Sequence, residues 1–418
     1  MQQSDFAEIM ISYSLSTACS CILLMAAIRD KGLLFLLLAL AIIARLLLVF
    51  GIPCLSDDIY RFFWDGLLMH DSINPLSYMP KDIMLESNLT EKEYEALYPL
   101  LNSQEYFTIY PPISQIVFYI ATIPEVFSIY KSTIIMKVIL LLGEMGLLYY
   151  LYQLLSKLNM DRSNVLIYAL NPLVIVEIMG NVHFEGMMVL FLIMGIMLIT
   201  HNRMILAALA ITASVATKLL PLMFMPLILL YLIREGRPYI KFLLTFAFFC
   251  AVFFVPFFMG LDIPHFVESL DLYFRKFEFN ASIYYLSRYV GKLITGYNQI
   301  SIIGPLLSLL SLGLILFISW RSYKQDEGVG ELIVSIFFIF ITYLLLATTV
   351  HPWYLILPIS LTVFYRRIWI VVWSLMIILS YSTYADPDYN QNLYLISIEY
   401  IIVGIVWYIE TKTRIKIN

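Results

Sequence analysis

Long apolar runs follow one another along almost the whole chain, and short charged segments separate them. A helix needs about 20 apolar residues to cross a bilayer. Such runs predict spans near residues 9–28, 32–51, 113–130, 133–156, 165–180, 184–200, 203–218, 219–233, 239–259, 299–320, 331–349, 354–365, 367–384 and 393–410. The pattern therefore predicts an all-α polytopic membrane protein with about 12–14 transmembrane helices and one domain over residues 1–418.

Two hydrophilic segments interrupt this pattern, and we expect both to be outer loops. The first covers residues 52–110, where acidic residues outnumber Lys and Arg, and the second covers residues 260–298. Within the first, residues 77–108 mix aromatic and aliphatic side chains with charges. That mixture predicts an amphipathic helix lying along the membrane surface.

The charged connectors predict the orientation of the chain. If the spans alternate, one side receives Arg29, Lys31, Lys157, Arg162, Arg234, Arg237, Lys241, Arg321, Lys324, Arg366, Arg367, Lys412, Arg414 and Lys416. Positive connectors favour the cytoplasm, so residues 52–110 and 260–298 face the opposite side. This arrangement requires the run 113–130, which Pro124 and Glu125 interrupt, to be a half-helix that returns to the outer face.

Composition narrows the possible classes of protein. Hydrophobic residues make up 61% of the chain and charged residues 13%, which excludes an ordinary soluble protein. A net charge of −4 provides no basic patch for nucleic acid. The four cysteines contain no Cys-x-x-Cys pair, so we predict structural thiols without a zinc site or a disulfide framework.

Ionisable side chains at membrane depth are costly and are therefore candidate functional groups. Asp57 and Asp58 directly follow the second predicted span. Two adjacent carboxylates there could act as a base, bind a cation or be solvated loop charges. The aromatic run that begins at Tyr60 could be an interfacial belt, and Tyr110-Pro111-Pro112 could be a helix start.

Further polar groups fall on the same predicted side. Asn181, His183 and Glu185 share an outer turn, Lys218 breaks an apolar run, and His351 stands at the outer end of a span. Each group alone could be a structural residue that satisfies local hydrogen bonds. Their shared side favours a single pocket in which cationic side chains and carboxylates receive a phosphate-bearing lipid.

These segments, in this order over roughly residues 50–360, resemble GT-C glycosyltransferases. They are most similar to bacterial polyprenol-phosphate-mannose-dependent mannosyltransferases. The motifs are Asp57-Asp58-Ile59-Tyr60-Arg61, Trp64-Asp65-Gly66, Tyr110-Pro111-Pro112, Gly180-Asn181-Val182-His183-Phe184-Glu185, Ala216-Thr217-Lys218-Leu219-Leu220-Pro221, Phe279-Asn280-Ala281-Ser282 and Val350-His351-Pro352-Trp353-Tyr354. The turn at Asn181 departs from the usual Gly-Asn-Gly-His-Asn-Asp through Val182 and Glu185.

The resemblance implies an inverting hexosyl transfer in a bacterial cell membrane, with mannose favoured. The donor is a polyprenyl-phosphate sugar, the acceptor is a hydroxyl of a glycan or glycolipid, and the site faces the periplasmic or extracellular side. By this resemblance Asp57 is the base and Asp58 its alternate. A departing phosphate gains negative charge, so cationic donors matter at the transition state.

The remaining roles follow from the same resemblance. The groups expected to bind the donor phosphate are His351, Lys218, Arg288 and Arg61. Those expected to line the sugar or acceptor pocket are His183, Glu185, Asn181, Tyr110, Trp353 and Tyr60. We expect no cofactor and no metal; a divalent ion, if used, would find oxygen ligands at Asp57, Asp58 and Glu185.

Two alternatives use similar features. A transporter or flippase of lipid-linked sugars also needs intramembrane charges and broken helices, but it predicts related halves that the chain lacks. A polysaccharide polymerase or ligase typically carries a large late outer loop, whereas here the largest loop, residues 52–110, comes early.

Overall fold

The computed structural model describes residues 4–85, 92–123, 127–259, 277–325, 328–386 and 388–413. In these residues helices dominate, and β-type pairing is limited to an isolated parallel bridge between Phe279 and Thr349. The predicted all-α polytopic class is confirmed. Pro124, Glu125, Arg414 and Lys416, and residues 260–276 of the second predicted loop, lie outside the described residues.

Eight helical segments in the described ranges are long and apolar enough to cross a membrane. They are α1 (Phe6–Arg29), α2 (Leu34–Val49) with the 3-10 turn before it, α7 (Ile129–Lys157), α13 (Tyr239–Phe258), α16 (Ile300–Lys324), α17 (Val329–Leu346), α19 (Ile368–Met376) with the 3-10 helix Ile377–Ala385, and α20 (Leu393–Thr413). A ninth span would be a broken one. Its first part ends with α8 (Val165–Ala169), and its second part consists of α9 (Pro172–Ile175) and the π-helical turn Val176–Gly180. The two parts are bent by 59° relative to each other.

The other predicted spans are shorter apolar helices. They are α6 (Pro112–Ala121), α10 (Glu185–Thr200), α11 (Met204–Thr217), α12 (Met225–Arg234) with the 3-10 helix Leu220–Phe224, and α18 (Ile356–Thr362) with the 3-10 helix Pro352–Leu355. At 1.5 Å per residue, these helices are shorter than a bilayer core of about 30 Å. In the described residues the number of full-length spans is therefore 8, or 9 with the bent pair, rather than 12–14, because polar or proline-containing turns divide several apolar runs.

Helices α10 and α11 can be short because protein surrounds much of them. They pack on each other, and α10 also packs on α7 and α18. Ile193, Ile196 and Ile211 are fully buried. Helix α6 has only 10 residues and packs on α3 (Asp58–His70), as expected of a half-helix rather than a span.

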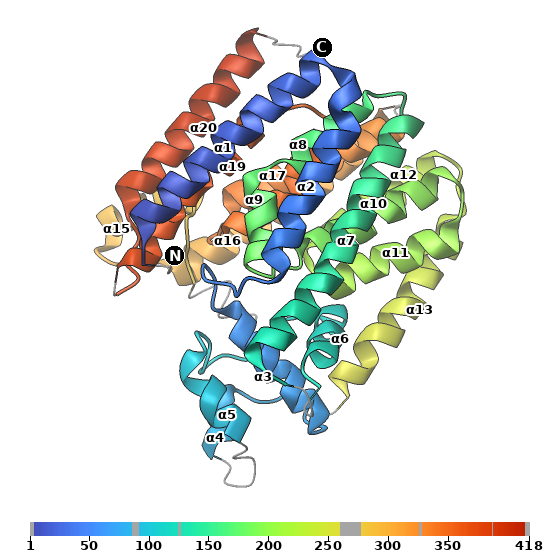
Figure 1. Cartoon of the computed structure of the whole chain (residues 1–418). Coiled ribbons are helices and arrows are strands. Elements are labelled where there is room, and N and C mark those ends of the chain that lie inside the picture. Colours follow the sequence, from blue (N-terminus) through green and yellow to red (C-terminus); the bar gives the residue numbers. More distant parts are fainter. Residues whose placement is uncertain are drawn as a thin grey trace.

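The first predicted outer loop forms a small helical layer at one end of the bundle. It contains α3, α4 (Pro80–Leu85) and α5 (Lys92–Leu97), and Figure 1 places it at the same end as the N-terminus and opposite the C-terminus. Within residues 77–108 the described part of the chain forms two short helices, α4 and α5, and their lying along a membrane surface stays a prediction. Tyr94 and Leu97 are 1% exposed, and the Tyr94 ring meets Trp64 of α3 at 5.0 Å, so α3 covers these apolar side chains.

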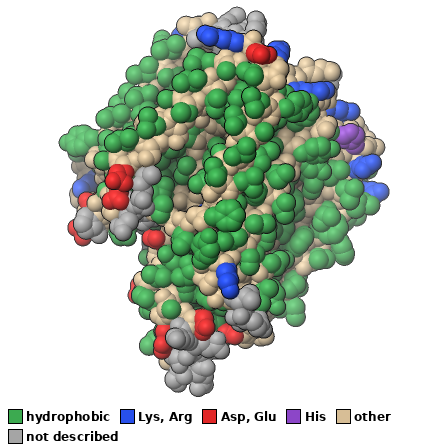
Figure 2. All heavy atoms as spheres, viewed as in Figure 1, with side chains coloured by type: hydrophobic (Ala, Val, Ile, Leu, Met, Phe, Trp, Pro, Cys, Tyr) green, Lys and Arg blue, Asp and Glu red, His purple; other side chains and the backbone are tan. Residues whose placement is uncertain are grey.

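Charge is distributed unevenly between the two ends. Figure 2 shows hydrophobic side chains over the flank of the bundle, with Lys and Arg mainly towards its upper and right edges. Asp and Glu gather mainly towards the lower end, where the first loop lies. This asymmetry agrees with the positive-inside pattern of the connectors.

Buried polar contacts join the helices that lead to the first loop. Arg45 of α2 pairs with Glu144 of α7 through Nε and Oε2 at 3.0 Å, and Tyr168 donates to the same carboxylate at 2.7 Å. Lys137 of α7 donates to the carbonyl oxygens of Leu48 and Gly51 at 3.0 and 2.5 Å. These bonds anchor the end of α2, and with it the start of the loop.

Breaking the Arg45–Glu144 pair should destabilise the bundle. Arg45→Met leaves the Glu144 carboxylate buried without its cation, which should lower the free energy of unfolding by about 3–5 kcal/mol. Thermal unfolding in detergent measures this effect. The double variant Arg45→Met/Glu144→Met should recover part of the loss, and an unchanged midpoint in the single variant would contradict this role.

Candidate functional site

The carboxylate pair lies at the start of α3. Asp57 is the N-cap residue of the helix and Asp58 its first residue, where the helix dipole favours negative charge. The Asp58 carboxylate accepts hydrogen bonds from Asn102 Nδ2 at 3.1 Å and from the Tyr110 hydroxyl at 3.3 Å. Asp58 is therefore held in place, and the structure brings Tyr110 to the carboxylate pair.

Asp57 differs from its neighbour. It is half-buried, and within the described ranges no side chain hydrogen-bonds to its carboxylate. Burial, and secondarily the charge of Asp58, raise the pKa of Asp57. Burial and the charge of Asp57 raise the pKa of Tyr60 as well. A half-buried carboxylate with a raised pKa is a stronger base than an exposed one.

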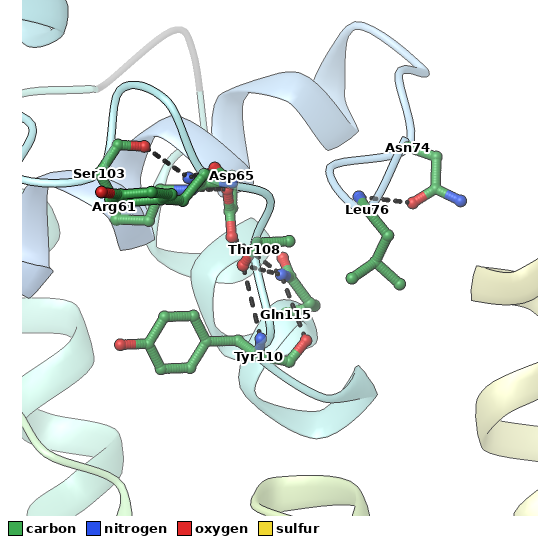
Figure 3. A network of polar contacts seen from close by, with 9 residues as sticks. Arg61, Asp65, Asn74, Leu76, Ser103, Thr108, Tyr110 and Gln115 are labelled. Carbon is green, nitrogen blue, oxygen red and sulfur yellow. Dashed lines mark hydrogen bonds and ion pairs between the residues drawn. The ribbon is translucent and has the colours of Figure 1, made fainter. Parts of the chain in front are cut away.

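A network around α3 positions this end of the loop. Arg61 Nε pairs with Asp65 at 2.7 Å, and its NH1 donates to the carbonyl oxygens of Ser103 and Tyr106 at 3.3 and 2.7 Å. Gln115 Nε2 donates to Asp65 at 2.9 Å, so α6 joins the same network (Figure 3). Through these contacts Arg61 positions the end of the loop. Its role in binding the donor phosphate stays a prediction.

The turn before α10 carries the predicted imidazole. Val182 has φ +65°, a left-handed conformation that is strained for a β-branched residue. Asn181 Nδ2 donates to Glu177 Oε2 at 3.0 Å, and His183 N donates to the Glu177 carbonyl at 3.1 Å. The His183 ring then stacks on Trp353 at 3.8 Å.

Glu185, two residues after His183, brings a carboxylate to Lys218. Glu185 begins α10, and Lys218 follows the last residue of α11 with extended backbone. Lys218 Nζ lies 2.5 Å from Glu185 Oε1, and the lysine side chain is 16% exposed. Next to Glu185, Gly186 lets α10 approach Glu144 and Ile178 closely, because a Cβ there would lie 2.4 Å from Glu144 Oε1 and 2.6 Å from Ile178 Cδ1.

The segment that carries His351 pairs with the second outer loop. Phe279 N donates to Thr348 O at 3.0 Å, and Val350 N donates to Phe279 O at 2.8 Å. His351 stacks on Trp353 at 4.3 Å and on Phe279 at 4.8 Å. His183, Trp353, His351 and Phe279 thus form a continuous stack of rings.

Both imidazoles of this stack are neutral near pH 7. Burial and the charge of Lys218 lower the pKa of His351 to about 3. Burial, Lys218 and His351 lower the pKa of His183 well below its usual value. His351 can therefore act as a hydrogen-bonding group, while Lys218 supplies the positive charge.

Three buried polar atoms of this cluster lack a hydrogen-bond partner among the described residues. They are His183 Nε2, Glu185 Oε2 and His351 Nδ1. His183 Nε2 lies 3.4 Å from Glu177 Oε2, a contact too poorly aligned to count as a hydrogen bond. Buried polar atoms are normally satisfied, so the cluster has the unused hydrogen-bonding capacity that a polar ligand requires.

Electrostatic interactions connect the cluster with the start of α3. The charge of Lys218 interacts with both imidazoles, and the charge of Asp58 interacts with the carboxyl groups of Glu177 and Glu185. These charge interactions and the contacts described above link the following described side chains, some of them through Glu177: Asp57, Asp58, Tyr60, Tyr110, Asn181, His183, Glu185, Lys218, His351 and Trp353. Arg288 lies elsewhere, paired with Glu278 and stacked over the Tyr285 ring at 4.5 Å.

Sequence reasoning missed two residues of this region. The buried Glu177 carboxylate accepts a hydrogen bond from the Tyr381 hydroxyl at 2.6 Å. Glu177 interrupts an apolar run, so the rule applied to Lys218 would have selected it. The tyrosine has no comparable signal. In the part of the chain that is described, no group of three or more His, Cys, Asp or Glu side chains could hold a metal ion.

Comparisons with known proteins agree with the motifs. A family model described as alpha-(1->6)-mannopyranosyltransferase, N-terminal domain, matches residues 19–234. Alpha-(1->6)-mannopyranosyltransferase A of Mycobacterium tuberculosis (strain ATCC 25618 / H37Rv) is 26% identical over 196 residues, which are 46% of this chain and 36% of that protein. The alignment thus spans about a third of the length of that relative. Because the family model covers more than half of the 418 residues, the chain belongs to the alpha-(1->6)-mannopyranosyltransferase family.

Proposed function

We propose that this protein transfers a mannosyl residue from a polyprenyl-phosphate donor to a hydroxyl of a glycan or glycolipid, with inversion at the anomeric carbon. The observation that carries the proposal is the Lys218–Glu185 pair beside two unsatisfied imidazoles, with Asp58 near enough for its charge to interact with Glu185. Family membership favours a transferase over the transporter and polymerase alternatives.

The carboxylate pair suits the acceptor side of the reaction. Asp57 has no hydrogen-bond donor within the described residues, so its oxygens are available to the proton of an acceptor hydroxyl. Asp58 is engaged by Asn102 and Tyr110 and orients the start of α3. One carboxylate suffices as base, because inversion by direct displacement needs no second carboxylate as nucleophile.

The Lys218 cluster suits the donor side. The bond from the anomeric carbon to the phosphate oxygen breaks as the acceptor oxygen attacks, and the phosphate leaves with both electrons of that bond. Lys218 is partly exposed and would balance this charge, while His351 Nδ1 would donate or accept a hydrogen bond as a neutral ring. Trp353, stacked between the two imidazoles, would present its edge to the sugar.

The carboxylate pair stands at the start of α3, in the first loop at one end of the bundle (Figure 1). The charge distribution of Figure 2 supports placing this end on the periplasmic or extracellular side. A membrane-embedded donor explains why the site is built on a polytopic bundle, because only the sugar phosphate must reach the polar cluster. We propose that transfer needs no cofactor, with Lys218 in the role that a metal would otherwise fill.

Replacing the proposed base should abolish transfer. Asp57→Asn removes the proton acceptor and should slow transfer by a factor of about 100 or more, because the amide keeps the shape of the side chain but not its basicity. Transfer of radiolabelled mannose and binding of the donor lipid are measured together, and donor binding should persist. Asp82→Asn, in the same loop, serves as the matched control. Full activity of Asp57→Asn would overturn this assignment.

The acid limb of the pH profile should report on the base. Transfer should increase as the pH rises through the pKa of Asp57, because only its ionised form accepts a proton. Burial and Asp58 raise that pKa, so the limb should lie above the value of about 4 that is usual for Asp. In Asp58→Asn the neighbouring charge is lost, and the limb should move to lower pH. A limb that stays in place or moves upward would contradict the coupling.

Loss of His351 should affect the donor more than the acceptor. His351→Ala should raise the KM for the donor by a factor of about 10 through the lost hydrogen bond to phosphate, with little change in the KM for the acceptor. Because the ring is neutral, His351→Gln should retain more activity than His351→Ala. His201→Ala, an exposed histidine in a connector, is the control. Equal effects on both substrates would show that His351 is structural.

A further inference from the structure

A carboxyl group lies fully buried in α20, outside the part of the chain that the family model matches. Glu399 is 0% exposed, and the ion pairs between described residues do not include it. The buried carboxylates Glu144, Asp65 and Glu185 differ, because each pairs with an Arg or a Lys. An ionised carboxylate buried without a cation is costly, so Glu399 needs another form of compensation.

Two oxygen atoms at this position lack a hydrogen-bond donor. Glu399 Oε1 accepts from Trp373 Nε1 at 2.8 Å and from Asn280 Nδ2 at 3.2 Å. The second oxygen of the carboxyl group, Oε2, and the amide oxygen Asn280 Oδ1 have no partner among the described residues. An ionised carboxylate and an amide oxygen only accept, whereas a protonated carboxyl group also donates. One proton on Glu399 Oε2 would therefore let it donate to Asn280 Oδ1 and satisfy both atoms.

The described neighbours of Glu399 do not supply a cation. Helix α19 and the 3-10 helix that follows it pack on α20, and neither contains Lys, Arg, Asp or Glu. The titratable group next to Glu399 on α20 is Tyr400, whose hydroxyl donates to Asn280 O at 2.7 Å. Arg288 of the second predicted outer loop is already paired with Glu278. A proton is the remaining way to satisfy the carboxyl group.

Asn280 is bound from several sides in an unusual backbone conformation. Its φ is +45°, in the left-handed region that Asn enters more readily than most residues. Its N–H donates to Gln391 Oε1 at 2.8 Å, and its carbonyl oxygen accepts from the Tyr400 hydroxyl. Together with the contact to Glu399, these bonds hold both the backbone and the side chain. Such a conformation persists where its surroundings enforce it.

The residue before Asn280 connects this position to the candidate site. Phe279 makes two backbone hydrogen bonds to the segment that leads to His351, to Thr348 O and from Val350 N. The Phe279 ring stacks on the His351 ring at 4.8 Å. A change at Glu399 would therefore reach His351 through Asn280 and Phe279.

We propose that Glu399 is a protonated positioning residue, whose carboxyl group forms two hydrogen bonds with the Asn280 side chain and so fixes the segment that holds His351. Oε2 donates its proton to Asn280 Oδ1, and Oε1 accepts from Asn280 Nδ2. The carboxyl group stays neutral and transfers no proton to a substrate. The consequence for donor binding rests on the proposed function, whereas the protonation of Glu399 does not.

Infrared spectroscopy of the full chain in nanodiscs tests the protonation without an activity assay. A protonated carboxyl group has a C=O stretching band above the amide I region, where an ionised carboxylate does not absorb. At neutral pH, Glu399→Gln should remove part of this band. Glu410→Gln is the matched control, because Glu410 lies on the same helix and pairs with Arg367 at 3.4 Å, and it should leave the band unchanged. A band that is unchanged in Glu399→Gln would overturn the proposal.

A pair of variants tests the positioning. Glu399→Gln keeps an acceptor for Asn280 Nδ2 and provides an amide donor for Asn280 Oδ1, so the KM for the donor should stay within about twofold. Glu399→Leu leaves the Asn280 amide buried without these bonds and should raise the KM for the donor by a factor of about 10, with little change in the KM for the acceptor. Thermal unfolding in detergent shows which variants fold. Glu399→Met, with a more adaptable side chain, is a second apolar variant with the same expected result.

The outcomes separate the positioning role from the proposed function. A folded Glu399→Gln that is as impaired as Glu399→Leu would overturn the neutral pair with Asn280. Equal changes in the KM for donor and acceptor in the apolar variants would show that Glu399 is structural and would also overturn the proposal. If no form of the protein transfers mannose, the proposed function fails, and the infrared band still decides whether Glu399 is protonated.

Discussion

Compensation of buried charge is the constraint on which this bundle depends. A carboxylate taken from water into an apolar interior must be paired or hydrogen-bonded. Glu144 is satisfied by Arg45 and Tyr168, and Asp65 by Arg61 and Gln115. The Lys218–Glu185 pair is different, because its lysine is partly exposed and Glu185 Oε2 has no partner in the described part of the chain. Arg45 NH2, Arg61 NH2 and Glu399 Oε2 also lack a hydrogen-bond partner among the described residues, so the partial exposure of Lys218 is what distinguishes the pair at the candidate site.

The same constraint explains why the polar side chains stand at helix ends. Asp57 caps α3, Glu185 opens α10, Lys218 ends α11, and His351 follows α17. Irregular backbone at membrane depth is tolerated only where protein buries it or where it lines a polar cavity. Breaking several apolar runs at one end of the bundle therefore creates a polar cluster without exposing peptide groups to lipid. The short helices α10 and α11 result from this arrangement.

The apolar pattern located every predicted span as a helical segment, but it did not give the spans' lengths. A helix surrounded by protein and a helix surrounded by lipid are equally apolar, so hydropathy alone cannot separate α10 from α16. Lys218 and His351 could be selected from the sequence because each is a polar residue in or beside an apolar run. The free-energy cost of placing such a residue in a bilayer can be recognised without knowing the structure. The contact between Glu177 and Tyr381 joins residues 204 positions apart, and no local signal reports it. The contacts of Arg61 with the carbonyl oxygens of Ser103 and Tyr106 likewise have no local signal, whereas its pairing with Asp65 follows the i,i+4 spacing of a helix.

The turn at Asn181 shows how a departure from a family pattern can preserve its chemistry. Glycine is expected where Val182 stands, and the backbone there keeps the left-handed conformation that glycine adopts freely. Such strain costs about 1–3 kcal/mol, which burial of the valine side chain, fully shielded here, can offset at about 1.5–3 kcal/mol. The turn still presents the His183 ring to Trp353. Likewise Glu185 replaces an expected aspartate with a carboxylate one methylene longer, and that carboxylate reaches Lys218. The two changes therefore leave the imidazole and the ion pair in place.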